Sequence, residues 1–292
     1  MTTARHRLEY AAYSAMMGSI GNLPLDASTG SAAGAARVLG KGLFRPRAER
    51  NLRFAMPELD AKARDPILDE MFECFARTAL EYRHLRRMIE EEDRIRVDGV
   101  EHLLAAREAG KGAVIVTGHL GNWEPIRIAA YRAGWPMALI YRAFNNPLFD
   151  ADARRMMQVL DAPVLHKGRR GAMGLLRHVR AGGVAMILVD QRFTKAPLIP
   201  FFGHPALTAV SAAEIAQGFG AKLLMARGIR RGRSSLFSVS FTPPLEVADR
   251  TPVEVMGEVN DRLEAWVRET PGQYFWLHNR WGRKALKEAG LL

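Results

Sequence analysis

Cysteine and long apolar runs are almost absent from this sequence. Its 292 residues contain a single cysteine, Cys74, which excludes a disulfide framework and a cysteine-rich metal site. The uncharged stretch at residues 10–25 is broken by glycine, asparagine and proline, and it is shorter than the ~20 apolar residues that span a bilayer. The uncharged stretch at residues 196–213 contains three prolines, which interrupt helices. We therefore expect no signal peptide, no transmembrane helix and a protein that works inside the cell.

Acidic residues are fewer than basic ones. Lysine and arginine number 42, aspartate and glutamate 31, and the formal net charge is +11. Such a balance favours an anionic partner, which includes nucleic acid, a membrane surface, and an acidic protein or substrate. Arginine supplies most of the positive charge, and its planar fork suits phosphate groups. A solvated basic face without a specific partner explains the charge equally well.

Motifs for binding nucleic acids and nucleotides are also missing. The sequence has no zinc-finger spacing, no strand of the RNA-recognition type and no basic zipper. Residues 118–121 follow an apolar run and contain two glycines, but the Gly-x-Gly-x-x-Gly and Walker lysine patterns are absent. We therefore expect no nucleic-acid partner.

The pattern of apolar residues changes near residue 94. Residues 1–93 favour helices, with a long amphipathic pattern over residues 61–92. Short apolar runs then alternate with helical patterns. The predicted strands are 112–117, 137–141, 184–189, 222–226 and 235–241, and the predicted helices are 125–132, 147–160, 171–180, 211–219 and 252–268. This alternation predicts an α/β layered core over residues 94–292, preceded by an N-terminal helical extension over residues 1–93.

The first helical segment has an apolar side that suits a membrane interface. Its members are Leu8, Tyr10, Tyr13, Met16, Met17 and Ile20. Packing of the same helix on the body of the protein is an equally good interpretation.

The sharpest local signal follows the strand predicted at residues 112–117. His119 stands between two glycines, which let the backbone or a ligand approach closely. Asn122 can cap the next helix, so that Glu124 lies in its first turn. A loop between His119 and Glu124 lets the carboxylate fold back, hold one ring nitrogen as a donor and leave the other free to accept a proton. A capping histidine beside an exposed glutamate is the competing interpretation.

Four further segments accompany this motif in a fixed order. They are YRAFNNPLFD at residues 141–150, LVDQR at 188–192, IPFFGHPALT at 199–208 and QYFWLHNRW at 273–281. With the His-x4-Glu motif, the series resembles the late (lauroyl and myristoyl) acyltransferases of lipid A biosynthesis, part of a wider lysophospholipid-acyltransferase-like group. The resemblance covers residues 8–284.

The resemblance implies an αβα acyltransferase-like core and a role for each matching residue. His119 would be the general base, and Glu124 would orient and charge it. Asp190 matches an acidic position beyond this dyad, and Gln191 follows it where members of the family often have Asp-Gln. Both are expected at the substrate site.

Basic and amide residues after the second predicted strand would bind substrate. The resemblance implies an arginine that faces the acyl carbonyl or a phosphate. We prefer Arg154 to Arg155 because it shares a helix face with Met157. Arg142 and Asn146 are expected in a substrate loop, and turn formation is the alternative, since Asn-Pro commonly opens a turn.

The resemblance also implies an activity. Members of the family transfer a fatty acyl chain from acyl carrier protein, sometimes from coenzyme A, to a hydroxyl of a glycolipid, at the cytoplasmic face of the bacterial inner membrane. We expect such a reaction here, with a lipid A precursor or a related glycolipid as acceptor, no metal or cofactor, and peripheral or shallow attachment through the extension. A lysophospholipid acceptor and a non-catalytic lipid-binding role are the alternatives.

Overall fold

The computed structural model describes residues 2–291, except for the side chains of Met16 and of residues 19–21 and 37–43. Met16 and Ile20, two members of the predicted apolar side of the first helix, therefore lie outside the described side chains. Helices form most of the N-terminal part, as the sequence predicts. They are α1 (Ala4–Gly21), α2 (Leu25–Leu43), α3 (Arg45–Ala55), α4 (Ala61–Glu81), the short 3-10 helix η1 (Tyr82–His84) and α5 (Leu85–Glu90).

A seven-stranded, mostly parallel sheet follows, as the predicted α/β class requires. Its order is β1-β9-β8-β2-β5-β3-β4. The strands are β1 (Ile95–Asp98), β2 (Ala113–Thr117), β3 (Met137–Tyr141), β4 (Val164–His166), β5 (Val184–Leu188), β8 (Lys222–Arg230) and β9 (Phe237–Phe241). Strands β8, β2, β5, β3 and β4 run parallel, whereas β9 is antiparallel to β8. A separate hairpin joins β6 (Leu198–Phe201) to β7 (His204–Leu207).

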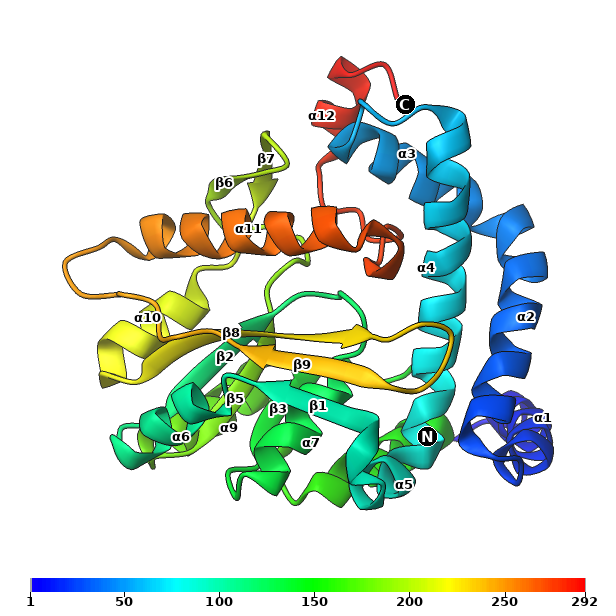
Figure 1. Cartoon of the computed structure of the whole chain (residues 1–292), viewed down its shortest axis with the longest axis horizontal. Coiled ribbons are helices and arrows are strands. Elements are labelled where there is room, and N and C mark those ends of the chain that lie inside the picture. Colours follow the sequence, from blue (N-terminus) through cyan, green and yellow to red (C-terminus); the bar gives the residue numbers. More distant parts are fainter. Residues whose placement is uncertain (1, 292) are drawn as a thin grey trace.

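Helices cover both faces of the sheet (Figure 1). Alternate residues of a strand point to opposite faces, and in β2 the pairs Val114/Val116 and Ala113/Ile115 belong to different hydrophobic clusters. The first pair packs with α9 (Arg169–Arg180), α10 (Ser211–Phe219) and α11 (Pro252–Glu269). The second packs with α6 (Val100–Glu108) and α7 (Glu124–Arg132). This is the αβα layering that the sequence predicts.

Further helical elements complete the fold. They are α8 (Pro147–Met157), the 3-10 helices η2 (Glu92–Arg94), η3 (Gln158–Leu160) and η4 (Pro271–Gln273), and α12 (Arg283–Glu288). Helices α2 and α4 lie side by side across the end of the sheet where β8 finishes (Figure 1). The N-terminal helices thus close the edge at which the parallel strands end. The division of the chain at residue 93/94 stays a prediction.

The first helix packs on the protein through its aromatic residues. The rings of Tyr10 and Tyr13 lie 5.7 and 4.8 Å from that of Phe149 on α8, and Met17 is buried. Of the predicted apolar side, Leu8 is 75% exposed. Among the described residues, none of the helices combines the length and the apolar character needed to cross a membrane.

Candidate active site

Two neighbouring strands bring the central pair of side chains together. Strands β2 and β5 are parallel and pair Thr117 with Leu188 at their ends. His119 follows the first strand by two residues, and Asp190 follows the second by two. Because parallel strands end at the same edge of a sheet, the two side chains meet there. His119 Nδ1 lies 2.7 Å from one carboxylate oxygen of Asp190, and its backbone N–H donates to the other at 2.7 Å.

Gly118 makes this close approach possible. A Cβ atom at this position would lie 2.9 Å from Leu263 Cδ1 and 3.2 Å from Asp190 Oδ2. Contacts of this length displace neighbours in a packed interior. The absence of a side chain at Gly118 therefore leaves room for the Asp190 carboxylate next to the loop that carries His119.

The electrostatics of the pair leave His119 with a free nitrogen. Asp190 is completely buried, and burial alone would raise its pKa, but the charge of His119 and hydrogen bonds from it outweigh that effect and hold the pKa well below its usual range. An ionised Asp190 can only accept, so Nδ1 carries a proton, and in the neutral form of the ring Nε2 keeps its lone pair. The Gln191 side-chain nitrogen lies 3.3 Å from Nε2, as a donor to that lone pair would.

Three rings surround the His119 imidazole. Their centroids lie at 4.4 Å for His278, 5.3 Å for Trp123 and 6.3 Å for Phe275. Burial, followed by repulsion from His119, lowers the pKa of His278 to about 4, so this second imidazole is neutral near pH 7. The Phe275 N–H donates to the His119 carbonyl at 3.0 Å. The C-terminal segment is thus attached directly to the loop that carries His119.

Glu124 does not contact His119, which corrects the geometry expected from the sequence. Its side chain is 1% exposed. One carboxylate oxygen accepts from the Tyr82 hydroxyl at 3.0 Å, and the other from Arg127 Nη1 at 2.7 Å. Asp190 occupies the position on the imidazole that we expected Glu124 to take. The physical reason is that Glu124 starts α7 and faces Arg127 one turn later, away from the strand ends. A role for Glu124 in catalysis stays a prediction.

Comparison with known proteins decides the family. The model of the bacterial lipid A biosynthesis acyltransferases matches residues 2–283. The chain belongs to this acyltransferase family.

Individual acyltransferases are similar over most of the chain. A lipid A biosynthesis acyltransferase of Haemophilus influenzae is 24% identical over 80% of this chain and 74% of its own length. The lipid A biosynthesis palmitoleoyltransferase of Escherichia coli is 22% identical over 84% of this chain and 80% of its own. A phosphatidylinositol mannoside acyltransferase of Mycobacterium tuberculosis is 25% identical over 80% of this chain and 75% of its own.

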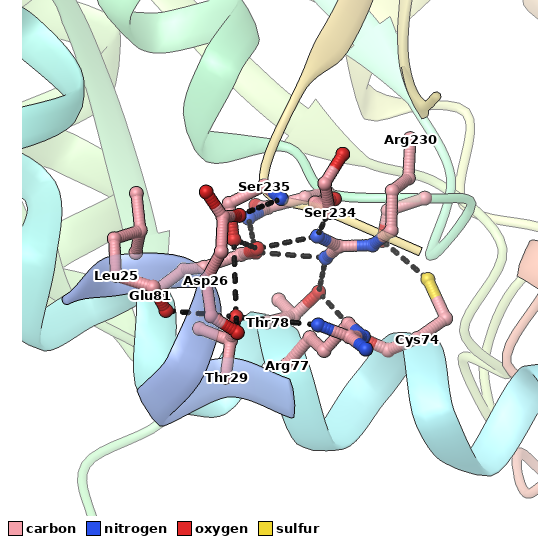
Figure 2. Close-up of polar contacts among 12 residues, drawn as sticks. Leu25, Asp26, Thr29, Cys74, Arg77, Thr78, Glu81, Arg230, Ser234 and Ser235 are labelled. Atoms are coloured by element: carbon pink, nitrogen blue, oxygen red, sulfur yellow. Dashed lines mark hydrogen bonds and ion pairs between the residues drawn. The ribbon is translucent and has the colours of Figure 1, made fainter. Parts of the chain in front are cut away.

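A buried ion pair at the end of α4 supports the loop that follows His119 in this acyltransferase. Glu81, at the end of α4, is completely buried and pairs with Arg230, and it accepts from Ser235 Oγ at 2.6 Å (Figure 2). The same carboxylate accepts from Asn122 Nδ2 at 2.7 Å, while Asn122 Oδ1 accepts from the Glu124 N–H at 2.9 Å. Asn122 therefore bonds to the first residue of α7 from the position before the N-cap, Trp123, rather than from the predicted cap position, and it is held in place by Glu81.

The single cysteine of the acyltransferase lies beside this ion pair (Figure 2). Cys74 is 2% exposed, and burial raises the pKa of its thiol to about 11. It is therefore a protonated core residue rather than a thiolate nucleophile.

The other predicted substrate residues lie at the same edge without joining the central pair. Asn146 is 5% exposed and caps α8 through the Leu148 N–H, and it donates to the His6 carbonyl of α1 at 3.0 Å. This is the turn chemistry named as its alternative. Arg142, Arg154 and Arg155 are all exposed. Arg142 donates to Asn145, and Arg155 pairs with Asp152 at 3.1 Å. The choice of Arg154 over Arg155 stays a prediction.

Proposed function

We propose that this protein is an O-acyltransferase that moves a fatty acyl chain from an acyl thioester to a hydroxyl of a lipid A precursor or a related glycolipid. The observation that supports it is the His119–Asp190 pair at the end of the parallel strands. It supplies a base: the His119 side chain is 12% exposed, and its Nε2 lies beside the polar side chain of Gln191. The names of the similar proteins support the lipid acceptor.

In the proposed reaction His119 acts as general base. Nε2 takes the proton of the acceptor hydroxyl while the oxygen attacks the thioester carbonyl carbon. When the tetrahedral intermediate collapses, the carbon–sulfur bond breaks, and the thiolate of acyl carrier protein or coenzyme A leaves with the proton from Nε2. Asp190 stabilises the imidazolium in between. General-base assistance of this kind is worth about 10²–10⁴-fold in rate, and no metal or cofactor takes part in these steps.

Gln191 is the proposed donor to the oxyanion. Backbone N–H groups of His119, Gly121, Asn122 and Glu124 already donate within the protein. The Gln191 amide, by contrast, is exposed and bonded only weakly to Nε2, at 3.3 Å. When the acceptor hydroxyl takes its place on Nε2, the amide is free to donate to the carbonyl oxygen of the thioester, where negative charge develops.

The loops around the site are proposed to rest on an anionic membrane surface at the cytoplasmic face of the inner membrane. Phe144 and Phe193 are 55% and 50% exposed. They follow the ends of β3 and β5, which are neighbours and parallel, so both lie at the edge that carries His119. Exposed Arg142, Arg192 and Lys195 flank them. Aromatic rings between basic residues suit the boundary of an anionic bilayer.

Vesicle co-sedimentation tests this surface without using the activity. We expect binding to phosphatidylglycerol vesicles to exceed binding to phosphatidylcholine vesicles, and to fall in the variant with Phe144→Ala and Phe193→Ala. The matched control carries Leu104→Ala and Val253→Ala, two residues 37% and 43% exposed on α6 and at the start of α11, at the far end of the sheet in Figure 1. An equal loss in both variants would contradict the proposed surface.

The activity itself is tested with a panel of donors and acceptors. Acyl carrier protein and coenzyme A thioesters of several chain lengths are offered with a lipid A precursor and with lysophospholipids, and products are followed by mass spectrometry. We expect acylated glycolipid from the wild type and at least 10²-fold less from a folded His119→Ala variant. Acylated lysophospholipid alone would favour the alternative acceptor. Equal product from both proteins would exclude His119 as the base, and no product from either would favour lipid binding without catalysis.

A further inference from the structure

Glu124 is joined to the environment of His119 through two other side chains. Trp123 Nε1 lies 2.8 Å from the Tyr82 hydroxyl, and that hydroxyl lies 3.0 Å from Glu124 Oε1. The indole of Trp123 in turn lies against the His119 ring. We propose that Glu124 acts on His119 through Tyr82 and Trp123, which makes both of them positioning residues for the general base. The proposal rests on the proposed function of His119.

The chain of hydrogen bonds has one possible direction. An indole N–H donates and cannot accept, so the Tyr82 oxygen must accept from Trp123. The Tyr82 proton is then directed to Glu124, which accepts it. Each member therefore determines the orientation of the next, and rotation of the tyrosine hydroxyl would break both bonds at once.

The Glu124 end of the chain is firmly held. Its second oxygen accepts from Arg127 Nη1 at 2.7 Å, and Arg127 Nη2 donates to the Met157 carbonyl at 3.2 Å. Arg127 and Glu124 are 0% and 1% exposed. Burial and the nearby charge of Glu124 raise the pKa of Tyr82 well above its usual value, so the hydroxyl stays protonated and keeps donating.

At the other end of this series of hydrogen bonds, Trp123 limits a tilt of the His119 ring that Asp190 does not prevent. The Asp190 carboxylate holds Nδ1 of His119 by one bond, which does not by itself prevent the ring from tilting. The indole of Trp123 meets that ring edge-on, at 5.3 Å between centroids and 70° between planes. A displacement of the indole would let the imidazole tilt, and small misplacements of a catalytic group slow the chemical step.

Tyr82 also shows that the N-terminal helices take part in the site. It lies in η1, directly after Glu81, within the part of the chain predicted as an extension. Glu81 holds Asn122 while Tyr82 holds Trp123 and Glu124. Two consecutive residues therefore support the loop that follows His119 from outside the α/β layers.

A double-mutant cycle on the full-length protein tests the proposal. Tyr82→Phe removes the oxygen and keeps the ring, and Trp123→Phe removes the indole N–H and keeps an aromatic ring. We expect each to lower kcat about three- to tenfold, the value of one or two neutral hydrogen bonds, with KM unchanged. Both substitutions interrupt the same hydrogen-bonded link between Trp123 and Glu124. The double variant is therefore expected to be no slower than the slower single variant.

Two further measurements separate positioning from a general loss of stability. The ¹⁵N indole resonance of Trp123 is expected to shift in Tyr82→Phe and also in Glu124→Gln, although Glu124 does not touch the indole. The matched control, Tyr131→Phe on α7, removes a hydroxyl that is not part of the Trp123–Tyr82–Glu124 series, and it is expected to change neither kcat nor this resonance. All single variants are compared in kcat at a temperature where thermal unfolding shows them folded.

The outcomes distinguish this proposal from the proposed function. Multiplying effects in the double variant, an effect on KM alone, or an unchanged kcat in Tyr82→Phe would each overturn the positioning role, even if His119→Ala abolishes activity. If His119→Ala keeps full activity, the assignment of the base fails first, and the positioning role fails with it.

Discussion

The two carboxylates predicted near His119, Asp190 and Glu124, differ in what they bind. Both are buried, at 0% and 1% exposure. Asp190 pairs with an imidazole, whose charge changes during the proposed reaction, whereas Glu124 pairs with Arg127, which is charged throughout. A carboxylate opposite a titrating ring contributes to the energy of the chemical step. A carboxylate opposite a permanent cation contributes chiefly to geometry and stability.

The largest effect is expected from Asp190→Asn. An amide cannot stabilise an imidazolium as a carboxylate does, and its N–H group opposes either the ring N–H or the backbone N–H of His119. We expect kcat to fall about 10³-fold, at the middle of the range for general-base catalysis. Steady-state kinetics on protein that thermal unfolding shows to be folded measure this fall.

Glu124→Gln should affect mainly stability. It leaves the fully buried Arg127 without an anion, and breaking a buried pair in this way costs about 3–5 kcal/mol. We expect a clear drop in the urea midpoint, with kcat lowered only about tenfold in protein that remains folded. A stable Glu124→Gln variant with no activity, next to an active Asp190→Asn variant, would reverse the comparison of the two carboxylates.

His278→Phe tests the environment on the other side of the pair. The folded-state pKa of about 4 lies below the ordinary value of about 6.5. The neutral ring therefore contributes stability that is fully present above about pH 6.5 and is lost as the pH falls toward 4. Phenylalanine does not titrate, so the wild type should lose about 3 kcal/mol more than the variant over that range. Urea unfolding at several pH values measures the difference, and parallel losses would contradict the burial of a neutral His278.

The smallest effect on stability is expected from Gln191→Ala. Loss of one oxyanion donor typically costs about 10²-fold in kcat, and an exposed glutamine contributes little to stability. Rate and thermal unfolding are measured together. An unchanged rate would remove Gln191 from the reaction and leave the comparison of Asp190 with Glu124 as it stands.

The regular elements of the core were largely predictable from local patterns. The strand that precedes His119 is a fully buried apolar run, and the helix after it has an early proline and an asparagine that bonds to its first N–H group. The short β1 and β4, and the β6–β7 hairpin with Pro200 and Pro205, were missed. Strands of three or four residues carry too few alternations to be distinguished from loops.

His119 and Asp190 were both singled out from the sequence, but their contact was not predicted. His119 and Asp190 are 71 positions apart, and they meet because β5 is inserted next to β2 in the sheet, an order that no local pattern encodes. Tyr82 was missed altogether. It lies within an amphipathic helical stretch, where a tyrosine looks like any other half-buried residue.

The sequence by itself determined the αβα class, the family and the residue types of the candidate site, because apolar periodicity, glycine positions and motif order are written along the chain. The tertiary structure alone decided which carboxylate pairs with the His119 imidazole. That choice depends on the distance between strand ends and on the buried Arg127, and the five-residue spacing of His119 and Glu124 contains neither. The short separation of His119 and Glu124 along the chain suggested a contact, but the packing of α7 directs the Glu124 side chain to Tyr82 and Arg127 instead.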